Sequence, residues 1–524
     1  MLEQLTALSP CPSLPEMAEE TISPAGSAAS LSAAWDRPDK GNVANADDRA
    51  LRSTQTKLLY GFGSIAFGVK DNGFATFAML FYNQVIGLPA QLVSAVIMIA
   101  LIFDAFIDPV VGAWSDNLRS RWGRRHPFMY LSALPVAVSY LLLWNPPHWS
   151  QGGILAYLLV CAVIVRTFIT FYEIPSSALV AELTEDYDQR TVFLAYRYFF
   201  GWFGGLGMSI LAYAVLLEPD ATHKFGQLNP VGYSRYGMVA GAVMFVAILV
   251  SSWGTHKFIP RFHVPQRRRL SFGKMMAEML ATMWNRSFLV LTVAGIFFYV
   301  ATGLVFSLNQ YFATYFWELS ANQIALFSLL GLFAAAFAFV LALPLSKLFG
   351  KKWAAIGLFV GALFIGCAPL TLRLIGRFPP NGAPVLLPLL LFFATLSLMM
   401  MVASSVLLAS MLADVVEDSQ IVTQRRSEGV FFAGNSFMQK MASGLGLFVS
   451  GLLLWAVGFP TRAVPGHTDP RVVGQLAIVY IVALVVLYGI ALALVGFYRI
   501  SRADHEENLR RLAAEVTRAA PPLN

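Results

Sequence analysis

Long apolar segments separated by short polar connections make up the chain from residue 57 onward. Each segment is long enough to cross a bilayer, which takes about 20 apolar residues in a helix. Twelve are present, at roughly 58–86, 91–115, 127–145, 153–181, 192–217, 233–256, 287–316, 321–347, 353–374, 384–412, 429–457 and 472–498. Only helices and closed barrels satisfy every backbone polar group in lipid, and barrel strands are far shorter than these segments. The pattern predicts an all-α membrane protein with twelve transmembrane helices.

The composition agrees with a membrane protein. Of 524 residues, 57% are hydrophobic and 13% are charged, with a mean hydropathy of +0.62. Soluble domains carry about 25% charged residues. The net charge of +7 comes largely from bases in short connections, so it indicates membrane topology and not a nucleic-acid partner. The three cysteines fit neither a metal site nor a disulfide pattern.

The distribution of Lys and Arg orients the predicted helices. Bases gather in the connections 116–126, 257–286 and 347–352, whereas 87–90 has none and 146–152 has only a histidine. Because the basic connections of a membrane protein lie in the cytoplasm, both termini are expected on the cytoplasmic side.

The connection 257–286 divides the predicted helices into six and six. Acidic segments at 181–189 and 413–420 follow the fourth and tenth helices, which favours two halves related by a parallel repeat; two independently acidic loops are the alternative. Within the connection, 272–284 is either an amphipathic surface helix or a plain linker. The expected regions are a disordered cytoplasmic tail at 1–52, six-helix bundles at 53–256 and 287–500, the connection at 257–286 and a tail at 501–524.

Charged residues inside the apolar segments carry the functional signal. A carboxylate at the membrane centre costs about 2.5–3.5 kcal/mol, so such residues usually face an aqueous cavity. Asp104 and Asp108 lie four residues apart, on one face of the predicted second helix. The other polar members are Lys70 and Asp71 in the first helix, Arg166, Thr170 and Glu173 in the fourth, Arg197 in the fifth and Lys440 in the eleventh.

Two interpretations of these charges stay open. Four acids and four bases could neutralise one another and serve structure alone, and Arg166 has the weakest functional case. Alternatively, the carboxylates bind a cation or proton in a hydrated cavity while other groups bind a solute. The chain has no Gly-x-x-x-x-Gly-Lys-Ser/Thr loop and no set of catalytic or metal-ligating residues, which argues against an ATP-driven pump and against an enzyme. Glycines in the fifth and eleventh helices favour close helix packing, with bending during transport as the alternative.

Several motifs match a known family. The segment Gly112-Ala-Trp-Ser-Asp116, followed by Arg121 and Arg124, resembles the signature between the second and third helices of the major facilitator superfamily. The segments at 70–71, 104–109, 170–175 and 196–200, together with Lys440, are similar to helix motifs of the glycoside–pentoside–hexuronide:cation symporters, the family of melibiose permease.

The resemblance implies a secondary symporter for a small polar solute, such as a sugar or glycoside, that works by alternating access. It implies a substrate site at Lys70, Asp71, Glu173 and Arg197. It implies a coupling site for a proton or a sodium ion at Asp104, Asp108, Thr170 and Glu173, with Lys440 nearby, and a conformational latch at Gly112, Asp116, Arg121 and Arg124. It further implies a monomer in the bilayer of a bacterial inner membrane, with no cofactor except the coupling ion and no nucleic-acid partner.

Three positions depart from the family pattern. Ile107 stands where sodium-using sugar permeases have Asn, and Glu173 stands where they have Asp. Ser177 replaces an aromatic residue that stacks on sugar in melibiose permease. The first two departures favour a proton over sodium, and the third weakens the case for a galactoside. A lysophospholipid is the alternative substrate, and a sensor or scaffold that has lost transport is the alternative outside the transporter class.

Overall fold

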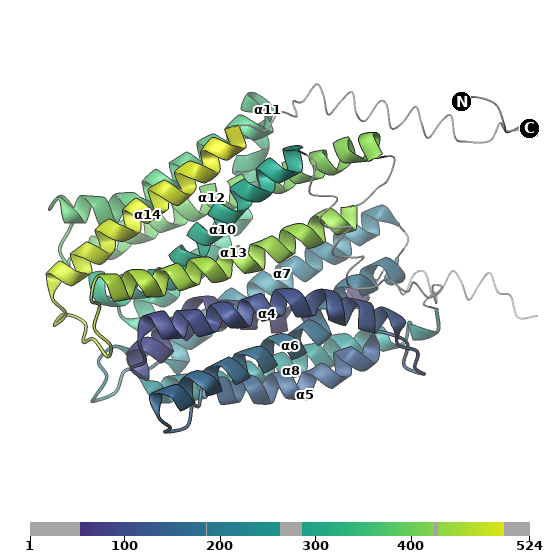
Figure 1. Cartoon of the computed structure of the whole chain (residues 1–524), viewed down its shortest axis with the longest axis horizontal. Helices are drawn as coiled ribbons and strands as arrows, with labels where there is room; N and C mark the ends of the chain where they lie inside the picture. Colours follow the sequence, from purple (N-terminus) through teal and green to yellow (C-terminus); the bar gives the residue numbers. More distant parts are fainter. Residues whose placement is uncertain (1–52, 185, 262–285, 424–427, 497–524) are drawn as a thin grey trace, which may run out of the picture. The chain divides into compact units, whose positions relative to one another are not determined.

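The regular structure is helical throughout the part of the chain that the computed structural model describes, residues 53–184, 186–261, 286–423 and 428–496 (Figure 1). The long helices are α4 (Ala90–Asn117), α5 (His126–Leu143), α6 (Gln151–Leu183), α7 (Tyr187–Leu211), α8 (Pro230–His256), α10 (Arg286–Tyr311), α11 (Ala321–Leu374), α12 (Leu386–Thr423), α13 (Glu428–Ala456) and α14 (Pro470–Gly496). In these ranges ten helices are long and apolar enough to cross a membrane. The predicted tails and the segment 272–284 lie outside the described residues.

The predicted first helix consists of four consecutive helical pieces. They are α2 (Thr54–Phe62), α3 (Ser64–Asn72) and the π-helical η1 (Gly73–Ala78) and η2 (Phe81–Val85). Gly63 joins α2 to α3, where the Tyr172 hydroxyl occupies the space that a Cβ would need. Because each piece alone is shorter than a membrane crossing, this passage is not among the ten spanning helices.

In α11 the structure has the predicted break between two helices, whereas α12 ends later than predicted. α11 contains both predicted helices 321–347 and 353–374, and Gly350 between them has φ 76° and ψ 158°, a conformation suited to glycine. α11 is therefore two helices that join at Gly350. α12 continues to Thr423, past the predicted end at 412, because no glycine or proline interrupts the acidic segment 413–420. The remaining predicted segments end within a few residues of the observed helices, two of them in the short π-helical pieces η3 (Ala212–Leu216) and η6 (Phe312–Phe316).

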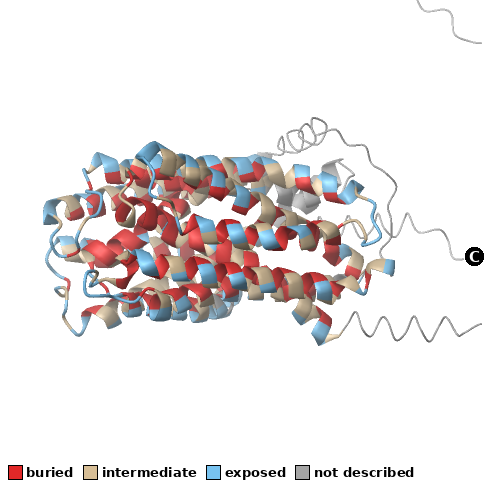
Figure 2. Cartoon of the chain, turned by 90° about the horizontal axis from the view of Figure 1, so that it is seen from below, coloured by how far each residue is buried: buried red, intermediate tan, exposed pale blue. Residues whose placement is uncertain are grey.

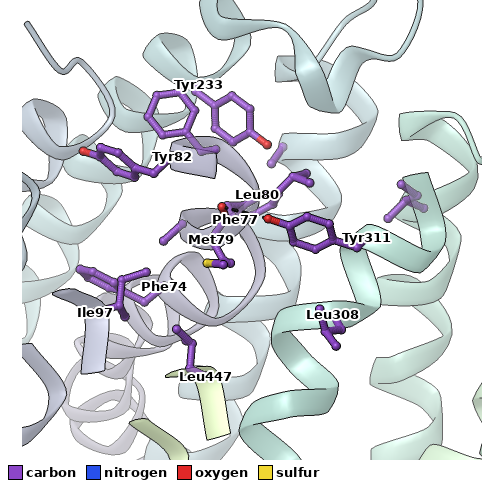
Figure 3. Close-up of a cluster of buried hydrophobic side chains, with 14 of the residues drawn as sticks. Phe74, Phe77, Met79, Leu80, Tyr82, Ile97, Tyr233, Leu308, Tyr311 and Leu447 are labelled. Atoms are coloured by element: carbon purple, nitrogen blue, oxygen red, sulfur yellow. Dashed lines mark hydrogen bonds between the residues drawn. The ribbon is translucent and has the colours of Figure 1, made fainter. Parts of the chain in front are cut away.

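Many aromatic side chains are buried between the helices, and other large apolar side chains are exposed. Trp144 stacks on Tyr233 with ring centroids 5.6 Å apart, and Phe77 lies 5.0 Å from Tyr213. Figure 3 shows Phe77 and Tyr233 in this buried cluster, which is part of the hydrophobic core. Exposed residues are pale blue in Figure 2. They include large apolar side chains such as Trp253, which is 79% exposed. Such a surface is stable in lipid, where exposed apolar groups carry no hydration cost.

A buried hydrogen-bond network joins η2 to the end of α10 and to η6. The Tyr311 hydroxyl donates to Asn83 Oδ1 at 2.8 Å, and the Tyr315 hydroxyl donates to Gln84 Oε1 at 3.0 Å. Gln84 Oε1 also accepts from the backbone N–H of Ala463, beyond α13, at 2.9 Å. Because these amide groups have partners, their burial does not carry the cost of unsatisfied polar groups.

Small residues let pairs of helices approach closely. α3 packs against α7 and α10 packs against α13. A Cβ on Gly68 would overlap the carbonyl oxygen of Gly201, and a Cβ on Gly446 would overlap that of Val300. These contacts support close packing as the role of the glycines.

We expect the substitution Gly68→Ala to lower the free energy of unfolding by about 1–3 kcal/mol, since the added methyl group overlaps α7. The matched control is Gly207→Ala, where nothing lies within 4 Å of the new Cβ. The control should leave stability unchanged or slightly raised, because alanine favours the helix. Thermal unfolding of the purified variants in one detergent measures both effects. Equal losses in the two variants would contradict the packing role.

Candidate functional site

A buried ion cluster forms where α4, α6 and α13 meet. Asp104 on α4 is 1% exposed. Its Oδ2 lies 3.3 Å from Arg166 Nη1 and 3.1 Å from Lys440 Nζ. Its Oδ1 accepts a hydrogen bond from the Thr170 hydroxyl at 3.1 Å. Both oxygens of this carboxylate are therefore engaged, and two bases from different helices compensate its charge.

Asp108 lies one helical turn further along α4. Its Oδ2 is 2.5 Å from Lys440 Nζ, and its Oδ1 is 3.0 Å from the Thr170 hydroxyl. This side chain is 19% exposed, so it is more accessible than Asp104. A hydroxyl group has one proton, so Thr170 donates to one of the two acids at a time. The contact with the other acid is a hydrogen bond only when that carboxyl group carries a proton.

Arg166, which has the weakest functional case in the sequence, also belongs to this cluster. It is buried, and its guanidinium carbon lies 4.4 Å from the centre of the Phe74 ring in η1. Among the described residues, its Nε has no hydrogen-bond partner. The ion pair with Asp104 and the aromatic face are thus the interactions that hold this charge in the interior.

The predicted substrate residues of α3 form an adjacent ion pair. Lys70 Nζ lies 2.6 Å from Asp71 Oδ1, with Lys70 2% exposed and Asp71 59% exposed. The charge of Lys70 also acts on Asp104. The pair therefore has a buried base beside the ion cluster and an acid that is open to a ligand.

Glu173 and Arg197, also predicted at the substrate site, lie on α6 and α7. The charge of Glu173 acts on Asp108 and Lys440, and also on Arg197. Arg197 is buried and donates to Ser176 Oγ at 2.9 Å and to the carbonyl oxygen of Glu173 at 3.2 Å. The structure therefore bonds Arg197 to the backbone of α6, whereas the sequence predicted a direct contact with substrate.

The latch residues lie at the far end of α4. Asp116 Oδ1 is 3.9 Å from Arg124 Nη1 and 3.3 Å from Arg125 Nη2. Glu182, near the end of α6, contacts Arg124 and lies 3.2 Å from Arg125 Nη1. Burial lowers the pKa of the Arg125 guanidinium from its ordinary value, and the charge of Glu182 opposes that shift. These contacts join α4, the start of α5 and the end of α6.

Two predicted latch members make other contacts. The Arg121 guanidinium lies 5.9 Å from the centre of the Trp122 ring. The arginines that pair with Asp116 are Arg124 and Arg125. A Cβ on Gly112 would make an ordinary contact, at 3.5 Å from Ile174. Close packing at Gly112 is therefore not required in this arrangement.

A family profile described as MFS/sugar transport protein matches residues 59–502. The chain belongs to this family. The match confirms the resemblance to the glycoside–pentoside–hexuronide:cation symporters of the major facilitator superfamily.

Relatives of this symporter family match most of the chain. An uncharacterised symporter of Synechocystis is 27% identical over 88% of this chain and 96% of its own length. The isoprimeverose transporter of Lactiplantibacillus pentosus is 24% identical, over 86% and 89%. The sodium-dependent lysophosphatidylcholine symporter 1 of Gallus gallus is 24% identical, over 89% and 90%. With ten apolar helices and bacterial relatives, the chain is a multi-pass protein of the inner membrane.

A solved structure shows the same fold. The inward-facing, unoccupied bacterial homologue of the human lysosomal transporter Spinster aligns with a TM-score of 0.57 and 13% identity, covering 87% of this chain and 99% of that one. At this identity the likeness concerns the fold alone.

Sequence reasoning missed some partners of the symporter's charged residues. Ser176 accepts a hydrogen bond from Arg197, and the Tyr60 hydroxyl donates to the Ser176 carbonyl oxygen at 3.0 Å. Neither residue carries a charge, so the pattern of charges does not identify them. Phe74 and Phe67 present ring faces to Arg166 and Arg197, and the apolar segments contain too many phenylalanines to single them out. Glu182 offered a signal, because it opens the acidic segment 181–189.

We expect Thr170→Val to lower the free energy of unfolding by about 1–3 kcal/mol, because it removes the hydroxyl between two buried acids while keeping the side-chain volume. Thr170→Ser keeps the hydroxyl and should lose less. Thermal unfolding of the purified symporter variants decides between them. A larger loss for serine than for valine would show that packing, and not the hydrogen bond, governs this position.

Proposed function

We propose that the chain is a cation-coupled symporter that carries a sugar or glycoside by alternating access, with a proton or a sodium ion as the coupling ion. The observation that supports it most is the pair of contacts between Lys440 on α13 and the two acids of α4. Lys440 lies in the predicted second bundle and the acids lie in the first. Any ion that changes the charge of the acids changes the attraction between the bundles, which is what coupling requires.

The proposed coupling residues are Asp104, Asp108, Thr170 and Glu173, with Lys440. The proposed substrate residues are Lys70, Asp71, Glu173 and Arg197. Among the latter, Asp71 is the most suitable acceptor for sugar hydroxyl groups, since most of its side chain is exposed while its partner Lys70 is buried. Arg197 acts indirectly, because it donates a hydrogen bond to the carbonyl oxygen of Glu173 and so positions that residue.

The proposed topology has twelve transmembrane helices and both termini in the cytoplasm. The passage from α2 to η2 counts as one crossing, and the two parts of α11 count as two. The bundles are 53–256 and 287–500, joined by the cytoplasmic connection 257–286, with cytoplasmic tails at 1–52 and 501–524. Gly112, Asp116, Arg121 and Arg124 form the latch on the cytoplasmic side, and Arg125 and Glu182 complete it. The chain works as a monomer, binds no nucleic acid and moves its solute without chemical change.

A lysophospholipid is the second candidate substrate. It is favoured by the full-length relative from Gallus gallus, whose name states sodium-dependent lysophosphatidylcholine symport. If the substrate is a lysophospholipid, long-chain lysolipids and detergent should compete with it for the substrate site. If the substrate is a glycoside, they should not.

The substitution Asp108→Asn tests the function. In proteoliposomes, the wild-type chain should accumulate at least one compound from a panel of glycosides, including isoprimeverose, under an imposed proton or sodium gradient. Asp108→Asn should reduce that accumulation to the level of empty liposomes, because the amide takes up no proton and has no negative charge for a cation to neutralise. The control Glu218→Gln changes an exposed acid outside the spanning helices and should transport normally. Accumulation by Asp108→Asn at the wild-type rate in both gradients would exclude the coupling role. Uptake of lysophosphatidylcholine alone would favour the second candidate.

A further inference from the structure

The acid pair of α4 offers a sodium ion few open ligands. A hard cation needs several oxygens at once. All four carboxylate oxygens of Asp104 and Asp108 already contact Arg166, Thr170 or Lys440. Ile107 adds no oxygen at this turn of the helix. Within the described residues, no group of three or more His, Cys, Asp or Glu side chains is placed to hold a metal ion. The arrangement therefore does not fit sodium.

The two bases of the cluster differ in how firmly they are held. Lys440 reaches across from α13 on a flexible stem and is 23% exposed, so movement of that helix withdraws it. Arg166 is 4% exposed and lies on α6, which belongs to the same predicted bundle as α4, whereas α13 packs against α4 from the other predicted bundle. The Phe74 ring covers its guanidinium, whose charge is permanent. When Lys440 leaves the acids, Arg166 therefore stays on Asp104.

We propose that Arg166 is the ion-specificity residue of this symporter. Its guanidinium holds the position on Asp104 that a sodium ion would need, so that sodium is excluded from the acid pair and the proton is the coupling ion. A proton needs one oxygen lone pair, whereas sodium needs several ligands that Arg166 does not release. The inference rests on the proposed symport function, since it assigns the coupling ion of the same site.

The test measures sodium binding without a substrate. The thermal unfolding midpoint of the purified full-length chain is compared in sodium chloride and in choline chloride of equal concentration. Four proteins are compared: the wild type, Arg166→Gln, Ile107→Asn and the double variant, which removes the guanidinium from Asp104 Oδ2, leaves Lys440 as the base on that oxygen and adds an amide oxygen. Arg166→Lys keeps the charge; it is the control and should behave as wild type. The midpoint in choline also shows whether each variant is folded.

We expect no sodium response in the wild type or in Ile107→Asn. The double variant should rise by about 2 °C or more once sodium exceeds its Kd about tenfold, because a ligand that binds only the folded state stabilises it. A response of Arg166→Gln alone would support the same conclusion. A response of the wild type or of Ile107→Asn would overturn the exclusion. A double variant that is folded but does not respond would show that Arg166 is not the determinant.

The outcome is separable from that of the proposed function. If a sodium gradient drives glycoside accumulation by the wild-type chain, the exclusion of sodium is wrong while symport stands. If neither gradient drives accumulation of any glycoside, the symport function fails, and the unfolding comparison still decides whether Arg166 blocks sodium.

Discussion

The structure depends on compensating the charge of Asp104 inside a membrane. A lone carboxylate there is costly, and a buried ion pair that loses one partner is destabilised by about 3–5 kcal/mol. The compensation comes from Arg166 and Lys440, which lie on α6 and α13. A single buried charge on α4 therefore fixes the position of two other helices. One of these contacts lies within the predicted first bundle, and the other reaches into the predicted second bundle.

The chemistry of the contacts changes along the length of α4. In η2, which precedes α4, the side-chain amides of Asn83 and Gln84 accept hydrogen bonds from neutral tyrosine hydroxyls. In its middle, carboxylates bond bases in a buried setting. At its end, Asp116 pairs with arginines while half of its side chain is exposed. Hydrogen bonds between neutral groups do not respond to binding of a cation, and exposed ion pairs are weakened by solvent. The middle of the helix is thus where a single bound ion has the largest effect on the contact between bundles.

The spacing of charges predicts which residues share a helical face, the resemblance to the symporter family predicts that these faces and Lys440 meet, and neither predicts how the side chains bond. Asp104, Asp108 and Thr170 were identifiable because polar residues at helical spacing in an apolar segment have few explanations other than a shared site. The role of Arg166 was not, because a buried arginine is satisfied by whichever acid and ring are near, and that depends on packing. The interruption of the first helix at Gly63 depends on packing in the same way. A hydropathy pattern records burial in lipid but not the local geometry of the backbone.

Three helices that present a proposed coupling or substrate group, α3, α4 and α6, are irregular beside that group. Pro109 follows Asp108 in α4, and Pro175 lies two residues after Glu173 in α6. Each proline lacks an N–H group, so the carbonyl oxygen four residues earlier loses its helical partner and the helix bends more easily there. α3 gives way to the π-helical η1 directly after Asp71 and Asn72, and such segments often occur at functional sites. A change in charge at the acids would therefore act beside the points where α4 and α6 bend more easily.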